Sequence, residues 1–136
     1  MKEKIHELLK KENYAFDTKN WKSIDNVPFL LDDDTTMLLN KIKLKMGMAK
    51  GIYIFSDCNQ NILYIGKGAP IYNRIRRHFA KMKKTCIAGK RHEFFQEIQT
   101  PITIYWVEIE QPEKREIVEH MLSYTLEPAF KKWNVI

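Results

Sequence analysis

Hydrophobic positions recur with two different periods along this chain, and the change between them predicts where its elements lie. Within residues 2–12 and 31–46 apolar side chains follow helical spacing. From residue 51 onward, the stretches GIYIF and ILYIG, joined by the polar turn SDCNQN, predict a β-hairpin. PITIYWVEIE at 101–110 predicts a third strand. A looser stretch with Trp21 and polar turns separates the first two helices.

Both strands of the hairpin are apolar on both faces. Side chains alternate between the two sides of a strand, so Tyr53 and Phe55 share one face and the isoleucines on either side of Tyr53 share the other. Such a hairpin is expected in the centre of a sheet that is covered on both sides. Further helices are expected from about residue 71 to 82, in a short piece around Phe94, and in QPEKREIVEHMLSYTLEP up to its second proline.

The composition is that of one ordinary globular domain. Of the 136 residues, 44% are hydrophobic and 29% are charged, which is enough apolar material for a core. No apolar run is long enough to cross a membrane, and the first residues, MKEKIHELLKKENY, are charged and amphipathic, unlike a secretion signal. We therefore expect a cytoplasmic protein that does not use a membrane.

Two groups of residues have the side chains of a metal site, and both have a simpler interpretation. Cys58, Cys86, His78 and His92 are zinc-ligand types, but their spacing matches no common zinc pattern, so free buried thiols are favoured. The acidic run at 32–34 stands at the start of a predicted helix. Carboxylates there cap free N–H groups and complement the helix dipole, which is the favoured interpretation.

The net charge of +6 is concentrated in one part of the chain. Between residues 58 and 92 there is no acidic residue, whereas the basic residues are Lys67, Arg74, Arg76, Arg77, Lys81, Lys83, Lys84, Lys90 and Arg91. A basic stretch of this density suits a polyanion, most often a nucleic acid. A solvated helix face and loop is the alternative that charge alone leaves open.

The helix expected at 71–82 has one apolar and one cationic face. The apolar face, with residues at core spacing, consists of Ile71, Ile75, Phe79 and Met82. The cationic face consists of Arg74, Arg77, His78 and Lys81. Arg74 lies in the first turn, close to the end of the strand that carries Tyr64. An arginine so placed can meet a phosphate with two hydrogen bonds.

One carboxylate of the last helix stands apart from the others. Glu119 falls at the edge of the wide apolar arc of that helix, whereas Glu113, Glu116 and Glu127 fall on the wetter side. A carboxylate at the rim of a core face can be held rigidly and still reach a cleft. The alternative is that Glu119 only pairs with Arg115.

These residues together resemble a known family. GIY at 51–53 and YIG at 64–66 are followed by Arg74, by His78 one helical turn later, and by Glu119 on a helix before LEP. The pattern is similar to that of the GIY-YIG nuclease superfamily, which includes excision-repair and intron homing endonuclease domains, and it covers residues 47–136. The resemblance implies an α/β domain of the α+β type, with a central three-stranded antiparallel sheet flanked by helices.

The resemblance also implies a metal-dependent endonuclease that hydrolyses DNA phosphodiester bonds. By that resemblance Glu119 binds a single Mg²⁺ or Mn²⁺, Arg74 contacts the scissile phosphate, and Tyr53, Tyr64, Lys67 and His78 line the site. Gly66 and Gly68 would let the phosphate approach the backbone, and Arg77 and Lys81 would bind the substrate. The family-like base is a tyrosine whose pKa must be lowered by Lys67, Arg74 and the metal. Which tyrosine serves, or whether His78 assists, stays open.

One position departs from the family pattern. The family often places an asparagine shortly after the proline that ends the catalytic helix, but Lys131 stands at that spacing here. Asn134 is the candidate for this role among the substrate-binding residues.

Residues 1–46 are expected to form a helical extension that covers the sheet. The alternative function is a catalytically silent module that binds nucleic acid, and a protein-interaction role is a third possibility.

Overall fold

Helices and strands follow one another much as the change of hydrophobic period predicts. The computed structural model describes residues 1–28, 35–82 and 89–132. The elements are α1 (Lys2–Lys11), β1 (Lys22–Val27), α2 (Thr36–Met46), β2 (Gly51–Ser56), β3 (Ile62–Gly68), α3 (Ile71–Met82), α4 (Lys90–Gln96), β4 (Ile102–Glu108) and α5 (Pro112–Leu126). The predicted α+β class and the hairpin of β2 and β3 are confirmed. In the described ranges no helix has the length and apolar character needed to cross a membrane.

The sheet has four antiparallel strands in the order β1-β4-β2-β3, one more than the three that the resemblance implies. The additional strand, β1, pairs with the outer edge of β4. Its sequence KSIDNV gives only a weak strand signal, because its buried residues do not alternate with exposed ones. The buried residues are Ile24 and Val27, and the register shifts between them. Asn26, with φ of 58°, lies within this irregular step.

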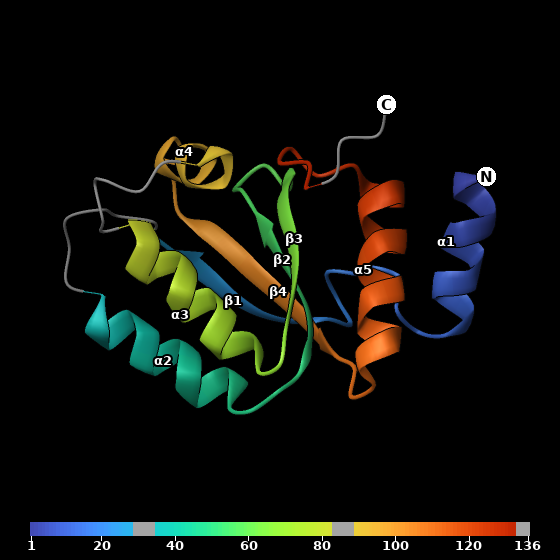
Figure 1. Cartoon of the computed structure of the whole chain (residues 1–136), viewed down its shortest axis with the longest axis horizontal. Coiled ribbons are helices and arrows are strands. Elements are labelled where there is room, and N and C mark those ends of the chain that lie inside the picture. Colours follow the sequence, from blue (N-terminus) through green and yellow to red (C-terminus); the bar gives the residue numbers. More distant parts are fainter. Residues whose placement is uncertain (29–34, 83–88, 133–136) are drawn as a thin grey trace.

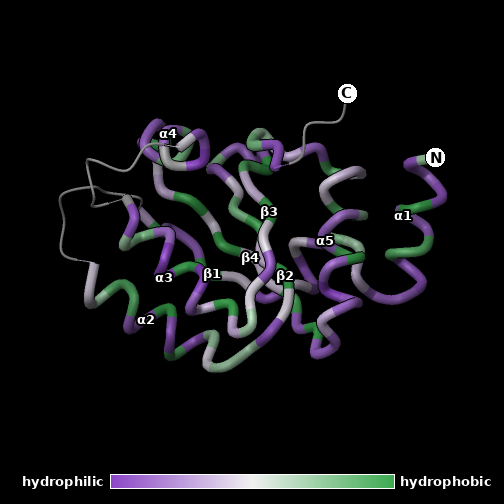
Figure 2. The backbone as a smooth tube through the Cα atoms, in the orientation of Figure 1, coloured by the Kyte–Doolittle hydropathy of each residue, from purple (hydrophilic) through white to green (hydrophobic). Residues whose placement is uncertain are grey.

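Helices cover both faces of the sheet (Figure 1). On one face α2, α3 and α4 pack against a cluster that includes Tyr53, Phe55 and Tyr64. On the other face α5, with α1 beyond it, covers a second cluster that includes Ile52 and Ile54. Figure 2 shows hydrophobic positions along the central strands and alternating hydrophobic and hydrophilic positions on the surrounding helices. The sheet is covered on both faces, as predicted, but the hairpin is not central in it, because β2 lies inside the sheet whereas β3 forms its edge.

The N-terminal residues contribute a strand as well as a helix. α1 packs along α5, where Lys2 Nζ lies 2.8 Å from a carboxylate oxygen of Glu127 and Leu9 is buried. The Trp21 indole N–H donates to the Ala15 carbonyl at 3.0 Å. Within residues 1–46, α1 therefore covers α5, β1 closes the β4 edge, and α2 covers one face of the sheet, while the boundary at residue 46 stays a prediction.

The outer edge of β3 carries the segment that follows α5. Glu127 ends α5 in the left-handed conformation, with φ of 48°, and turns the chain toward the sheet. The N–H groups of Ala129 and Phe130 then donate to the carbonyls of Ile62 and Leu63 at 2.9 and 3.0 Å. This contact carries the next residues to the face of β3 that faces α3.

Several predictions on metal and thiol sites fall outside the described ranges. The acidic run at 32–34, Cys86, Asn134 and the side chain of His92 all lie there, so the capping and zinc interpretations stay predictions. Cys58 is exposed rather than buried, because it lies in the polar turn of the hairpin. Among the described residues, no group of three or more His, Cys, Asp or Glu side chains is placed to hold a metal ion.

We expect Val27→Asp to destabilise the fold by about 3 kcal/mol or more, because Val27 is 0% exposed and an unpaired carboxylate there would be desolvated. Urea unfolding measures the change, and Asp25→Asn, at an exposed position of the same strand, is the control. An unchanged unfolding midpoint would show that β1 contributes nothing to the stability of the sheet.

Candidate active site

Two tyrosines and a histidine meet on the face of the sheet that α3 covers. Tyr53 comes from β2, Tyr64 from β3 and His78 from α3, and their side chains are at most 3% exposed. The Tyr53 hydroxyl lies 2.6 Å from Nε2 of His78. The Tyr64 and His78 rings stand edge to face, with centroids 5.4 Å apart. Phe95 of α4 packs against the Tyr64 and His78 rings, so aromatic contacts fix the position of both.

The absence of a side chain at Gly66 creates the place for the Tyr53 ring. Gly66 is the partner of Tyr53 across the hairpin. A Cβ at Gly66 would overlap Cζ and the hydroxyl oxygen of Tyr53. The phenol can therefore lie across the neighbouring strand and reach His78 only because residue 66 is glycine.

Burial and positive charge keep His78 neutral. Burial, followed by the charges of Arg74, Arg91, Lys132 and Lys81, lowers the pKa of His78 to about 2. At neutral pH the imidazole therefore has one nitrogen free to accept a proton. In the tautomer with the proton on Nδ1, the Tyr53 hydroxyl donates to Nε2.

Burial raises the pKa of Tyr53 well above its ordinary value, and Tyr64 adds to the rise. The charges of Arg74 and Arg91 act in the opposite direction but do not prevail. The expected lowering of a catalytic tyrosine pKa is therefore not found for Tyr53 in the metal-free protein. Complete burial of the phenol is the physical reason.

The carboxylate singled out in the last helix reaches the same site from the other side of the sheet. Glu119 is 2% exposed, and its Oε2 lies 2.9 Å from the ammonium of Lys132. That ammonium stands 4.7 Å from the centre of the Tyr64 ring. The alternative pairing with Arg115 is not observed, because Arg115 donates to the carbonyls of Ile109 and Glu110, both at 2.9 Å.

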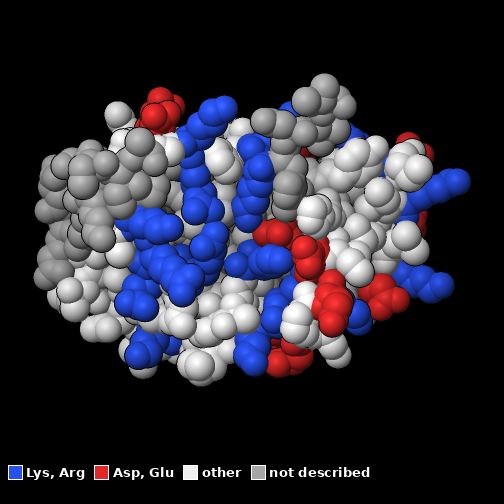
Figure 3. Space-filling model, in the orientation of Figure 1, with Lys and Arg blue, Asp and Glu red and all other residues white. Residues whose placement is uncertain are grey.

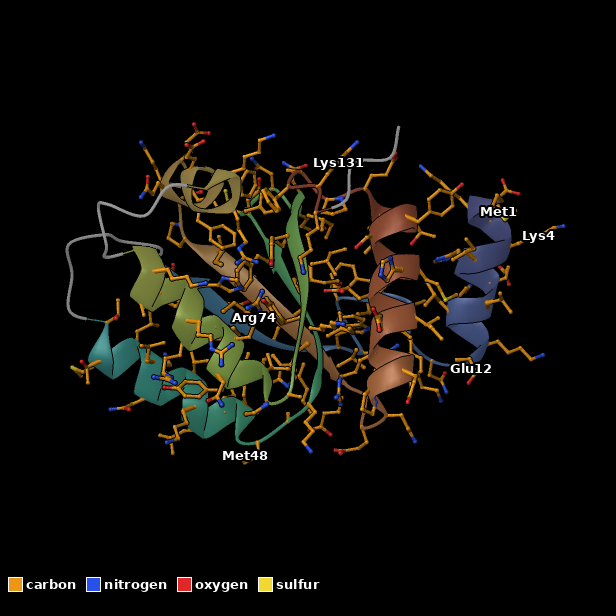
Figure 4. All side chains as sticks on the ribbon, viewed as in Figure 1. Met1, Lys4, Glu12, Met48, Arg74 and Lys131 are labelled. Atoms are coloured by element: carbon orange, nitrogen blue, oxygen red, sulfur yellow. The ribbon has the colours of Figure 1, made fainter. Side chains whose placement is uncertain are left out.

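A basic pocket adjoins this cluster. Its volume is about 480 Å³, and it is lined by Lys67, Gly68, Ala69, Pro70, Asn73, Arg74 and Arg77 on one side and by Pro112, Glu113, Arg115 and Glu116 of α5 on the other. Figure 4 shows Arg74 between α3 and β3. Figure 3 shows Lys and Arg side chains spread over this side of the molecule, with acidic ones beside them toward α5. Glu116 lines the pocket, and Glu119 follows it one helical turn later on α5. The pocket can therefore receive an anionic ligand close to Glu119.

The predicted site residues thus form two adjoining groups. Tyr53, Tyr64, His78 and Glu119 form a buried group, and Lys67, Gly68, Arg74 and Arg77 line the open pocket. Arg74 belongs to both, because its charge also acts on Tyr53 and His78. Lys81 is half-buried on α3 and acts on His78 by its charge, and Asn134 lies outside the described residues.

Sequence reasoning missed two cations at the centre of the site. Arg91 of α4 donates from Nη1 to the Tyr64 hydroxyl at 3.3 Å, and Lys132 pairs with Glu119. Both residues stand in short basic runs, KRH and KKW, but the helical period of the neighbouring elements does not extend to them. Only the way in which α4 and the segment after α5 fold back onto β3 brings them to Tyr64.

The residues present fit a single hard divalent cation. Glu119 supplies one carboxylate one helical turn beyond Glu116, which lines the basic pocket, and the carboxylate already pairs with a cation, the Lys132 ammonium. Mg²⁺ is typically held by one or two carboxylates and keeps several waters, which other oxygen ligands can replace. A site with one protein carboxylate is therefore chemically adequate.

We expect Gly66→Ala to displace the Tyr53 ring and to destabilise the protein by about 1–3 kcal/mol, because a Cβ would overlap a side chain with no free space around it. Thermal unfolding of Gly66→Ala, Tyr53→Leu and the double variant measures this. The cost of Gly66→Ala should largely vanish when the tyrosine ring is absent. Additive costs would contradict the proposed steric relation.

The pH dependence of stability should report on His78. Its pKa is about 2 in the folded protein and 6.5 in an unfolded chain, so between these values only the unfolded chain binds the proton. The contribution of His78 to stability is complete above pH 6.5 and is lost progressively as the pH falls. Below about pH 6, wild type should lose roughly 1 kcal/mol per pH unit more than His78→Gln in urea unfolding. Parallel stability curves would contradict the lowered pKa.

Comparisons with known proteins agree with this geometry. The family model described as "GIY-YIG catalytic domain" matches residues 49–134. UvrABC system protein C of Lactobacillus gasseri is 35% identical over 65 residues, which are 48% of this chain and 10% of that protein. The same protein of Lactobacillus helveticus is 34% identical over an equal length. The match thus spans about a tenth of the length of these relatives.

A solved structure shares the fold. The GIY-YIG N-terminal endonuclease domain of UvrC from Thermotoga maritima, a point mutant bound to its catalytic divalent cation, gives a TM-score of 0.52 at 19% identity. The alignment covers 71% of this chain and 97% of that domain, and a second point mutant gives 0.51 at 18% identity. The family model spans more than half of the chain and includes both tyrosine motifs of the hairpin. The chain therefore belongs to the GIY-YIG nuclease family.

Proposed function

We propose that this nuclease hydrolyses DNA phosphodiester bonds as an endonuclease that depends on Mg²⁺ or Mn²⁺. The observation that carries the proposal is the position of Glu119, a carboxylate that is 2% exposed and lies one helical turn after Glu116, which lines the pocket together with Lys67, Arg74 and Arg77. A binding surface for DNA alone has no need of a buried negative charge beside its phosphate contacts. A metal-dependent phosphodiesterase does need one.

DNA is the proposed substrate because cations surround the site on several elements. Lys67, Arg74 and Arg77 line the pocket, and Arg91 reaches Tyr64 from α4. Phosphate groups of a nucleic acid backbone bind to such cations, and Arg74 can hold one phosphate by two hydrogen bonds. Its charge would also offset the negative charge that develops on the phosphate oxygens during the reaction.

The Tyr53–His78 pair supplies a route for a proton. A phenolate at Tyr53 is disfavoured by burial, so the tyrosine would act together with His78 rather than as an isolated base. The Tyr53 oxygen would accept a proton from the attacking water while its own proton passes to Nε2 of His78. Burial is the main cause of the lowered pKa of His78, and the nearby cations add to it. Bound phosphate would offset the part due to the cations, so the imidazole would accept a proton more readily in the complex than in the free protein.

Glu119 would hold the divalent cation. Lys132 lies between Glu119 and the Tyr64 ring. When bound, the cation stabilises negative charge on the leaving oxygen as a Lewis acid. The residues of the chain hold the phosphate, move the proton and exclude bulk water from the buried group. Residues 1–46 would serve as an extension that covers α5 and the β4 edge. An exposed free thiol at Cys58 fits a cytoplasmic location.

A silent DNA-binding module is the second candidate, and one observation favours it. The Lys132 ammonium already neutralises Glu119, so the site tolerates the carboxylate without a metal. Such a protein would bind DNA through the same pocket but would not cleave it. Cleavage and binding therefore have to be measured separately.

We expect wild type to nick or linearise supercoiled plasmid with Mg²⁺ but not with EDTA, and Glu119→Gln to lose at least about a hundredfold in rate because the carboxylate is the proposed metal ligand. Gel shifts of the same proteins should show that Glu119→Gln still binds DNA. Glu110→Gln, which removes an exposed negative charge just before α5, is the matched control and should cleave normally. Binding without cleavage by wild type, on plasmid and branched DNA, would favour the silent module.

A further inference from the structure

A lysine ammonium occupies the carboxylate that the proposed function assigns to a divalent cation. Nζ of Lys132 lies 2.9 Å from Oε2 of Glu119, and the side chains are 20% and 3% exposed, respectively. The ammonium also stands over the Tyr64 ring, 4.7 Å from its centre. Water therefore screens this ion pair far less than a surface salt bridge.

The backbone that leads to Lys132 is fixed, whereas its side chain can move. Ala129 and Phe130 donate to carbonyls of β3, and the Phe130 ring packs against Tyr64 with centroids 5.7 Å apart. A lysine side chain has a flexible four-carbon stem. The ammonium can consequently leave Glu119 while the segment after α5 keeps its place on the sheet edge.

The ammonium and a divalent cation cannot both be close to Glu119 without a large repulsion. A divalent cation would be held by direct contact with the Glu119 carboxylate. With Lys132 still in place, a single and a double positive charge would then lie within a few ångströms of each other. In a shielded site their repulsion is much stronger than in water.

We propose that Lys132 is an internal counter-ion that competes with the divalent cation for Glu119. It neutralises Glu119 and stabilises the metal-free protein, and it lowers the affinity of the site for metal. This inference rests on the proposed function, because it takes Glu119 to be the metal ligand. It predicts that removal of the ammonium has opposite effects on metal affinity and on the stability of the metal-free protein.

The test is Mn²⁺ binding without DNA, measured by calorimetry and by the electron paramagnetic resonance of free Mn²⁺. Lys132→Met keeps the length of the side chain and removes its charge, so it should bind Mn²⁺ about tenfold more tightly than wild type. Lys131→Met removes the same charge from the exposed neighbouring residue and should bind within about twofold of wild type. Metal-free Lys132→Met should melt at a lower temperature, and Mn²⁺ should stabilise it more than it stabilises wild type.

Lys132→Arg tests the same inference, but here the expected change in Mn²⁺ affinity is a decrease. A guanidinium can pair with the carboxylate through two hydrogen bonds, so this variant should bind Mn²⁺ more weakly than wild type. It also provides an answer if Lys132→Met does not fold.

Equal or weaker Mn²⁺ binding by Lys132→Met, or unchanged binding by Lys132→Arg, would overturn the inference. Glu119→Gln separates this result from a failure of the proposed function. If wild type binds Mn²⁺ and Glu119→Gln does not, the metal site stands even when the Lys132 variants show no competition. Absence of Glu119-dependent binding in wild type and in Lys132→Met would overturn both.

Discussion

The contact between the Tyr53 ring and the backbone of Gly66 is the constraint on which the rest of the site depends. Because Gly66 has no Cβ, the ring of its cross-strand partner lies over β3, and the hydroxyl meets His78 of α3. The two tyrosine motifs of the sequence are therefore one steric unit. The glycine of the second motif makes room for the tyrosine of the first, and packing and chemistry place the same demand on these positions.

Around this unit the site is built across the β3 edge of the sheet. The tyrosines and His78 lie on the face covered by α3, whereas Glu119 belongs to α5 on the opposite face. β3 is the edge strand of the sheet order, so side chains from the two layers can meet beside it. The segment after α5, bonded to β3, completes the connection by placing Lys132 between Glu119 and Tyr64.

The sequence predicted those parts of the fold and site that repeat with a regular period. Alternation identified the β2–β3 hairpin and β4, and helical spacing placed Arg74 on the polar side of α3 and Glu119 at the rim of the apolar arc of α5. His78, which the same spacing assigned to the cationic face of α3, is instead 3% exposed and neutral, because it packs into the aromatic cluster around Tyr64. β1 was missed because its irregular register breaks the alternation. Arg91 and Lys132 were missed because no period links them to Tyr64. The apolar faces of the hairpin predicted that Tyr53 is covered, but the resulting rise of its pKa, opposite to the lowering expected of a catalytic tyrosine, depends on how completely distant elements bury it.

The distribution of the site over two layers has a consequence for the order in which properties appear during folding. The hairpin and α3 alone contain the basic surface that would attract DNA, but they lack the carboxylate. Glu119 arrives only when α5 has docked on the far face and the chain has turned back along β3. A partly folded or wrongly packed molecule would therefore carry the basic surface without the carboxylate, so the proposed hydrolysis would require the fully folded protein.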